Sequence, residues 1–213
     1  MILNLEQIQF IDTYLKNSEI EFIDVRMEMV DHVASEVANK MATENLDFYH
    51  AFKNYMVIHK KDHQKANKKF RTTTDIKVIR QIGAFFIKPI TILVFIGCLV
   101  ILKLLTSSFD LNQIIRFSPL AILTSLIIFY FISTRIGEKE RYSALERIGF
   151  ILMISTQMVQ LFFNPSYQIN HFEDHQNLNI FLISFLIVFV IGFVQLVLKY
   201  RKEYHMLYKN AFV

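Results

Sequence analysis

Apolar and polar residues are distributed unevenly along the 213-residue chain, and the pattern changes near residue 83. Before that point charged and apolar residues are mixed, and long apolar runs follow it. A helix needs roughly 20 apolar residues to cross a bilayer. Runs of about this length predict transmembrane helices at about 84–105, 119–136, 148–163 and 178–198. The second and third runs are short, so a re-entrant or interfacial segment stays open for each.

The basic residues beside these runs predict the side of the membrane on which each loop lies, because cytoplasmic loops carry an excess of Lys and Arg. Loop 135–147 and the tail 201–213 are basic, whereas loop 106–118 has only Arg116 and loop 164–177 has no Lys or Arg. We therefore expect a multi-pass protein of the plasma (inner) membrane with both termini in the cytoplasm. Four spans satisfy every segment. Three spans would place the basic tail outside, and two would leave two apolar runs unplaced.

Residues 1–58 have the periodicity of a small helical domain. Helices are predicted over 5–16, with Asn4 as N-cap, over about 20–41, and from Leu46 onward. Apolar residues three and four apart form one face of the second helix: Ile20, Ile23, Met27, Val30, Ala34, Val37 and Met41. The predicted fold class is all-α, with an N-terminal cytoplasmic three-helix domain ahead of a four-helix transmembrane bundle.

An acidic ridge lies beside this apolar face, formed by Glu21, Asp24, Glu28 and Asp31. One interpretation is a solvated helix face, and the other is a docking surface for a basic partner protein. His32 and Glu36 invite a metal site, but Asp31 and His32 are adjacent and point about 100° apart on a helix. We therefore predict no metal and no cofactor.

A basic segment over 59–83 connects the domain to the first apolar run. Its cationic side chains are Lys60, Lys61, Lys65, Lys68, Lys69 and Arg71. Such a cluster attracts anionic lipid headgroups by about 1 kcal/mol per basic residue. No base-reading module accompanies the charge, so nucleic acid is not expected. The expected partners are the anionic bilayer and either another protein or a second copy of the chain. Thr72–Asp75 predicts the start of a new helix.

Polar side chains are sparse within the apolar runs. Gln157 and Gln160 lie on one helix face, and hydrogen bonds to Gln195 are expected to join two spans, worth about 1 kcal/mol each. This interpretation is favoured over a substrate site.

No catalytic motif occurs, so we expect no enzymatic activity. His171 and His175 have an i, i+4 spacing, but their segment lacks helical periodicity and favours a polar loop over a metal site. The charged residues of 138–147 are interpreted as a solvated turn. The single cysteine, Cys98, excludes an intramolecular disulfide.

The segment Asp24–Val33, followed after a turn by Phe48, Ala51 and Phe52, resembles the HAAS-type helical module over about residues 5–58. In bacterial membrane proteins that module precedes several transmembrane helices, and such proteins are often encoded beside PadR-like transcription regulators. The resemblance implies a regulatory accessory role. We therefore expect a membrane-anchored regulatory or interaction protein that acts through its cytoplasmic domain. A small oligomeric transporter or channel is the alternative, and a membrane-bound enzyme comes third.

Overall fold

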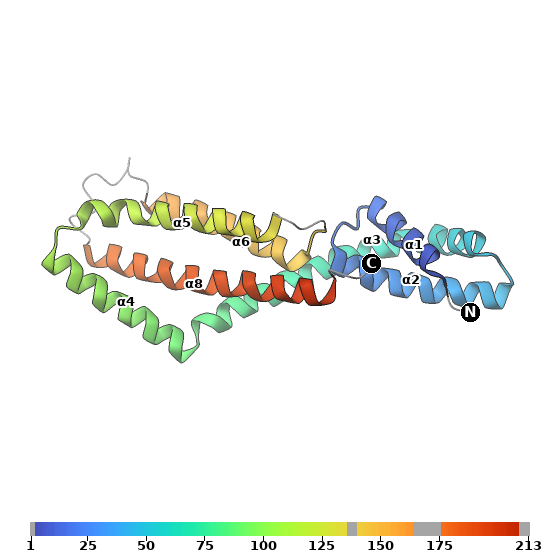
Figure 1. Cartoon of the computed structure of the whole chain (residues 1–213), viewed down its shortest axis with the longest axis horizontal. Helices are drawn as coiled ribbons and strands as arrows, with labels where there is room; N and C mark the ends of the chain where they lie inside the picture. Colours follow the sequence, from blue (N-terminus) through green and yellow to red (C-terminus); the bar gives the residue numbers. More distant parts are fainter. Residues whose placement is uncertain (1–2, 136–139, 164–175, 209–213) are drawn as a thin grey trace. The chain divides into compact units, whose positions relative to one another are not determined.

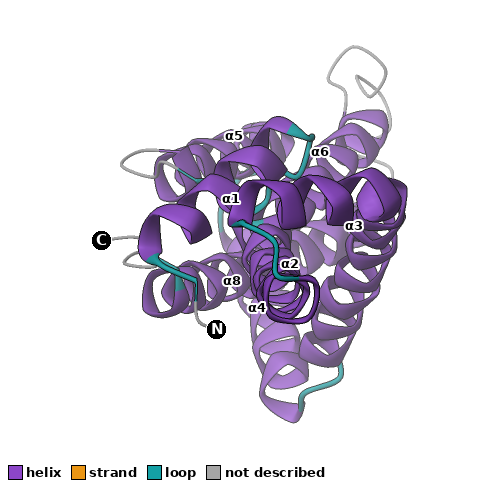
Figure 2. Cartoon of the chain, turned by 90° about the vertical axis from the view of Figure 1, so that its right-hand side faces the viewer, coloured by secondary structure: helices purple, strands orange, loops and turns teal. Residues whose placement is uncertain are grey.

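The structure is a computed structural model, and it describes residues 3–135, 140–163 and 176–208 (Figure 1). Within these ranges the chain is almost entirely helical and contains no strand, as Figure 2 shows. The helices are α1 (Leu5–Asn17), α2 (Ile23–Glu44), α3 (Phe48–Phe86), α4 (Pro89–Ser108), α5 (Asn112–Arg135), α6 (Ser143–Phe163) and α8 (Gln176–Leu207). The all-α fold class is therefore confirmed.

The helices belong to two compact units. Unit 1 comprises Met1–Ile76, Glu138–Glu146 and Glu203–Val213, and unit 2 comprises Lys77–Gly137 and Arg147–Lys202. Three segments that lie far apart in the sequence thus build unit 1. The predicted boundaries after residues 58 and 83 both fall inside α3, because that helix contributes residues to both units.

The core of unit 1 forms where α1, α2 and the first turns of α3 pack together. Asn4 is the N-cap of α1, as predicted, and its side chain accepts a hydrogen bond from the backbone N–H of Gln7 in a capping box. The core residues with no exposed surface are Ile11, Leu15, Val33, Val37 and Ala51. The second helix begins and ends three residues later than predicted. It continues to Glu44 because the chain turns only at Asn45, which adopts a left-handed conformation with φ 51°.

α3 is continuous through Thr72–Asp75, so the predicted new helix start there is wrong. The hydroxyl of Thr72 donates to the carbonyl of Lys68 (3.2 Å), and that of Thr73 donates to the carbonyl of Lys69 (3.1 Å). These hydroxyls bond back to the preceding turn and do not cap a new one. Neither Gly nor Pro occurs between residues 48 and 82, so nothing in the sequence interrupts the helix.

The first predicted apolar run, 84–105, is divided between two helices. α3 ends at Phe86, Lys88 has an extended backbone (φ −63°, ψ 134°), and α4 begins at Pro89. Proline lacks an N–H and disfavours a helical conformation in the residue before it. Pro89 therefore ends one helix and begins the next.

Among the residues that the structure describes, three helical stretches are long and apolar enough to cross a membrane: Pro89–Ser108, Phe117–Arg135 and Gln176–Leu207. α4 in particular exposes large apolar side chains, among them Ile90, Leu93, Ile101 and Leu104. An exposed apolar surface of this kind is stable in hydrocarbon and costly in water. α6 covers the predicted run 148–163, and it contains the polar residues Glu146, Arg147, Gln157 and Gln160.

Apolar side chains of unit 2 connect these helices to α6. One cluster contains Leu102 of α4, Ile115 of α5, Val159 of α6 and Ile183 of α8. α6 therefore packs with the candidate membrane spans.

Candidate functional site

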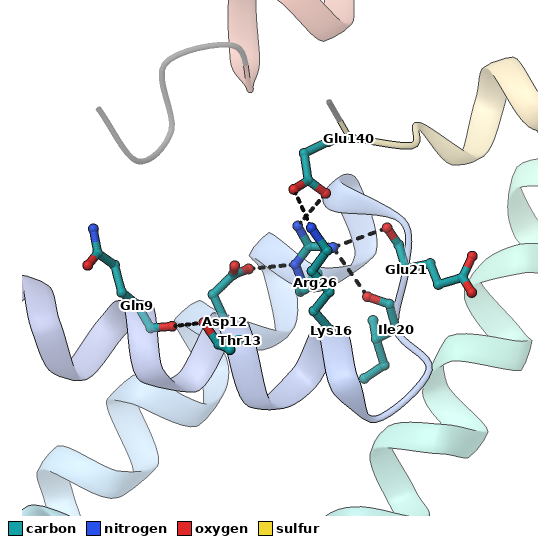
Figure 3. A network of polar contacts seen from close by, with 8 residues as sticks. All are labelled: Gln9, Asp12, Thr13, Lys16, Ile20, Glu21, Arg26 and Glu140. Carbon is teal, nitrogen blue, oxygen red and sulfur yellow. Dashed lines mark hydrogen bonds and ion pairs between the residues drawn. The ribbon is translucent and has the colours of Figure 1, made fainter. Parts of the chain in front are cut away.

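Arg26 is a buried charged side chain at the centre of a polar network in unit 1 (Figure 3). Only 1% of its surface is exposed. Its Nε donates to Oδ1 of Asp12 (2.5 Å) and its Nη2 to Oε2 of Glu140 (2.8 Å). Its Nη1 donates to the carbonyls of Ile20 (3.3 Å) and Glu21 (3.1 Å). A buried guanidinium is tolerated when its donors are paired in this way.

The two carboxylates around Arg26 come from different parts of the chain. Asp12 lies on α1, whereas Glu140 lies 114 residues after Arg26, in the segment that precedes α6. Lys16 of α1 also donates to Glu140, to Oε1 (2.7 Å). Burial alone would raise the pKa of Glu140, but the hydrogen bonds from Lys16 and Arg26 outweigh it and lower this pKa. Glu140 is therefore held as a carboxylate between two cations.

Further contacts attach the residues after Glu140 to α2. Arg141 forms an ion pair with Glu21, and its carbonyl accepts a hydrogen bond from the backbone N–H of Ile23 (2.9 Å). Asp24 accepts hydrogen bonds from the hydroxyl and from the backbone N–H of Ser143 (3.2 Å). We call residues 140–143 the docked segment.

Ser143 is the first residue of α6, so Asp24 places a carboxylate at the N-terminus of that helix. The first N–H groups of a helix lack partners within the helix itself, and the helix dipole favours a negative charge at that end. Burial raises the pKa of Asp24, and the hydrogen bonds from Ser143 oppose that rise. Asp24 is thus a partly buried acid that directly contacts the start of α6.

These contacts correct the interpretation of 138–147 as a solvated turn: Glu140 and Arg141 bind α1 and α2. They also divide the acidic ridge. Glu21 and Asp24 are bound by the docked segment, whereas Glu28 and Asp31 are exposed. Arg26 was not predicted as a site residue, because it lies beside the apolar face of α2 and its partner Glu140 is remote in sequence.

The exposed half of the ridge borders a groove between α2 and α3, with a volume of about 710 Å³. Glu28, Asp31 and His32 contribute from α2, and Lys69 and Phe70 contribute from α3. The other lining residues are Val25, Met29, Ser35, His63, Ala66 and Thr73. The groove therefore has charged sides and apolar residues between them.

His63 is the buried histidine of this groove. Its Nε2 lies 3.3 Å from the hydroxyl of Tyr55, and its ring lies 6.2 Å from the ring of His32. Burial lowers the pKa of His63, and the neighbouring His32 and His59 lower it further. His63 is therefore biased toward its neutral form, in which one ring nitrogen accepts a hydrogen bond.

The predicted lipid-binding lysines lie along α3. Lys60, Lys61, Lys65, Lys68 and Lys69 are all exposed, and the side chain of Arg71 is outside the described part of the structure. Lys65 also lies 3.9 Å from a carboxylate oxygen of Asp62, a weak exposed ion pair. Binding of this cluster to anionic headgroups stays a prediction.

The predicted intramembrane glutamines are Gln157 and Gln160 on α6 and Gln195 on α8. All three are exposed, and no hydrogen bond joins them among the described residues. The contact predicted between them stays a prediction.

Within the described ranges, no group of three or more His, Cys, Asp or Glu residues is arranged to hold a metal ion. His171 and His175 lie outside those ranges. No family model matches the chain, and no match was found among curated proteins or solved structures. The resemblance to the HAAS-type module therefore stays a prediction.

Proposed function

We propose that the protein is a membrane-anchored regulatory protein whose unit 1 binds a partner protein on the cytoplasmic side. The observation that carries this proposal is the attachment of the docked segment to α1 and α2. The docked segment continues directly into α6. A change in α1 or α2 can therefore reach α6, a predicted transmembrane helix, through the contacts of the docked segment.

The composition of unit 1 supports the predicted topology. A compact unit built from Met1–Ile76, Glu138–Glu146 and Glu203–Val213 lies on one side of a membrane, so each intervening stretch crosses an even number of times. The first stretch contains two candidate spans, α4 and α5. The second stretch contains the candidate span α8, so an even number of crossings requires that α6 crosses the membrane as well. This argument supports four spans, with both termini and the docked segment in the cytoplasm, where their basic residues favour them.

The groove is the proposed partner site. Glu28 and Asp31 stand at its edge, beside apolar residues such as Met29 and Phe70. A short partner segment that combines a basic side chain with an apolar one matches this surface. Complementary charge would mainly speed and orient such docking.

α2 connects the partner site to Ser143, the first residue of α6. Asp24 and Glu28 are one helical turn apart on α2, the first bound to Ser143 and the second lining the groove. An occupant of the groove therefore contacts the same helix that holds the start of α6. A partner that binds better when the docked segment is attached also stabilises that attachment, since coupling between two sites is reciprocal.

Charge reversal tests this function. The double variant Glu28→Lys and Asp31→Lys, made in the full-length protein in its native host, should abolish the protein's phenotype at normal abundance. The control is Glu6→Lys with Glu44→Lys, which reverses two exposed carboxylates outside the groove lining and should leave function intact.

A second set of variants tests the transporter alternative. Changing Gln157, Gln160 and Gln195 to Leu removes polar groups from α6 and α8, two of the predicted transmembrane helices. If the glutamine variant alone loses function, the regulatory proposal is wrong and a transport path is favoured.

A further inference from the structure

Unit 2 contains a cavity of about 390 Å³ between the C-terminal end of α3 and α8. Aromatic rings form much of its wall: Phe85, Phe86, Phe189 and Phe193. Two lysines, Lys88 and Lys199, and two amides, Gln81 and Gln195, contribute its polar groups. Its described lining contains no Asp or Glu. The cavity thus combines an apolar wall with cationic and amide donors, and nothing in that lining would repel an anion.

The apolar wall is built by close packing of α3 against α8. A Cβ atom added at Gly192 would lie 2.6 Å from Cδ1 of Phe85, so the missing side chain of this glycine gives the Phe85 ring its space. Phe86 stacks on Phe185 with ring centroids 5.3 Å apart and an interplanar angle of 9°. The rings are therefore fixed by neighbours on α8, and they leave a pre-formed apolar surface.

The polar groups are also held in place. Nζ of Lys199 donates to Oε1 of Gln81 (3.2 Å), which orients both side chains. Lys88 precedes Pro89 at the start of α4, where its backbone conformation is restricted. Lys88 and Lys199 are exposed, so both ammonium groups can meet a ligand.

The position of the cavity in the sequence indicates the kind of ligand. Lys88 immediately precedes the candidate span Pro89–Ser108, and Lys199 follows the apolar stretch of α8. Lysines at the ends of spans lie at the depth of lipid headgroups. A ligand with a negative headgroup and an apolar chain matches both the charge and the aromatic wall.

We propose that this cavity is a binding site for one anionic phospholipid, with its phosphate at Lys88 and Lys199 and an acyl chain against the rings of Phe85 and Phe189. This site differs from the lysine cluster of residues 60–71, which offers charge on an exposed helix without an apolar wall. This lipid site requires that α4 and α8 are membrane spans, and it does not require the partner binding proposed for unit 1.

The test uses the purified full-length protein in detergent and native mass spectrometry with two probes, phosphatidylglycerol and phosphatidylcholine with identical acyl chains. The wild type should retain phosphatidylglycerol in preference to phosphatidylcholine. The double variant Lys88→Gln and Lys199→Gln should weaken phosphatidylglycerol binding by roughly thirty-fold, at about five-fold for each lysine. The control Lys53→Gln with Lys103→Gln removes equal charge outside the cavity and outside the lysine cluster of residues 60–71, and it should bind as the wild type does.

The apolar wall has its own variant pair. Gly192→Ala should push the Phe85 ring into the cavity and reduce binding of both lipids, whereas Gly97→Ala, where nothing lies within 4 Å of the added atom, should not. Excess glycerol phosphate should fail to displace the lipid, because it lacks a chain. Equal retention of the two lipids, equal loss in the lysine control, or complete displacement by glycerol phosphate would each overturn the proposal.

Discussion

Replacing Arg26 with Met should strongly destabilise unit 1, because it removes four hydrogen bonds from a side chain that is 1% exposed. Breaking a buried ion pair by removing one partner costs about 3–5 kcal/mol. Here Asp12 and Glu140 retain 16% and 24% exposure, so water replaces part of the lost interaction. We therefore expect a loss near the lower end, about 3 kcal/mol.

Hydrogen exchange on the full-length protein in lipid nanodiscs measures this loss locally. A decrease of about 3 kcal/mol in opening free energy should make the slowest amides of α1 and α2 exchange roughly 100-fold faster. Residues 140–146 should lose protection together with them. The exchange rates of Arg26→Lys should fall between those of wild type and Arg26→Met, since lysine keeps the positive charge but lacks the planar guanidinium and its several donors.

Lys53→Met is the matched control, because it removes an exposed cation of the same unit. Its effect should stay within about 0.5 kcal/mol. If Arg26→Met exchanges like this control, the buried network does not hold the docked segment and the reasoning is refuted.

Two further changes test the core and the network. Val30→Asp places an unpaired charge at a position that is 4% exposed, so it should unfold unit 1. Glu28→Gln should change stability only slightly. Equal protease resistance of the two variants would contradict the assigned core. Glu140→Gln should cost about 1–2 kcal/mol at neutral pH. Because the pKa of Glu140 is lowered in the folded state, the contribution of its charge to stability is complete above the ordinary pKa of 4.5 and is lost as pH falls through the lowered pKa. The difference in unfolding free energy between wild type and Glu140→Gln should therefore shrink in acid. If chemical unfolding shows a difference that is constant with pH, the charge of Glu140 does not have this role.

The helices of unit 1 were largely predictable because their signals are local. Asn4 and Gln7 form a capping box within four residues of sequence, and Val30 and Val37 lie on an apolar face with helical spacing. The behaviour of Thr72 was not predictable in this way. A threonine hydroxyl can cap a new helix or bond back to the preceding turn, and the same residues are compatible with both.

The docked segment could not be predicted, because its contacts join residues more than 110 positions apart. Charges such as Glu140 and Arg141 resemble those of a solvated turn until their partners are known. Asp12 and Arg26 are closer in sequence and lie on adjacent predicted helices, so that pair was the detectable part of the site. Arg26 was overlooked because an arginine beside an apolar face is usually interpreted as exposed.

The proposal that the three segments of unit 1 lie on one side of the membrane is tested most directly by cysteine accessibility in intact cells. With Cys98 replaced by Ser, single cysteines at Asn54, Arg141 and Met206, one exposed position in each segment, should be protected from an impermeant thiol reagent and should react after permeabilisation. A cysteine at Phe109, between α4 and α5, should react in intact cells. Labelling of Arg141→Cys or Met206→Cys in intact cells, while Asn54→Cys stays protected, would contradict the account.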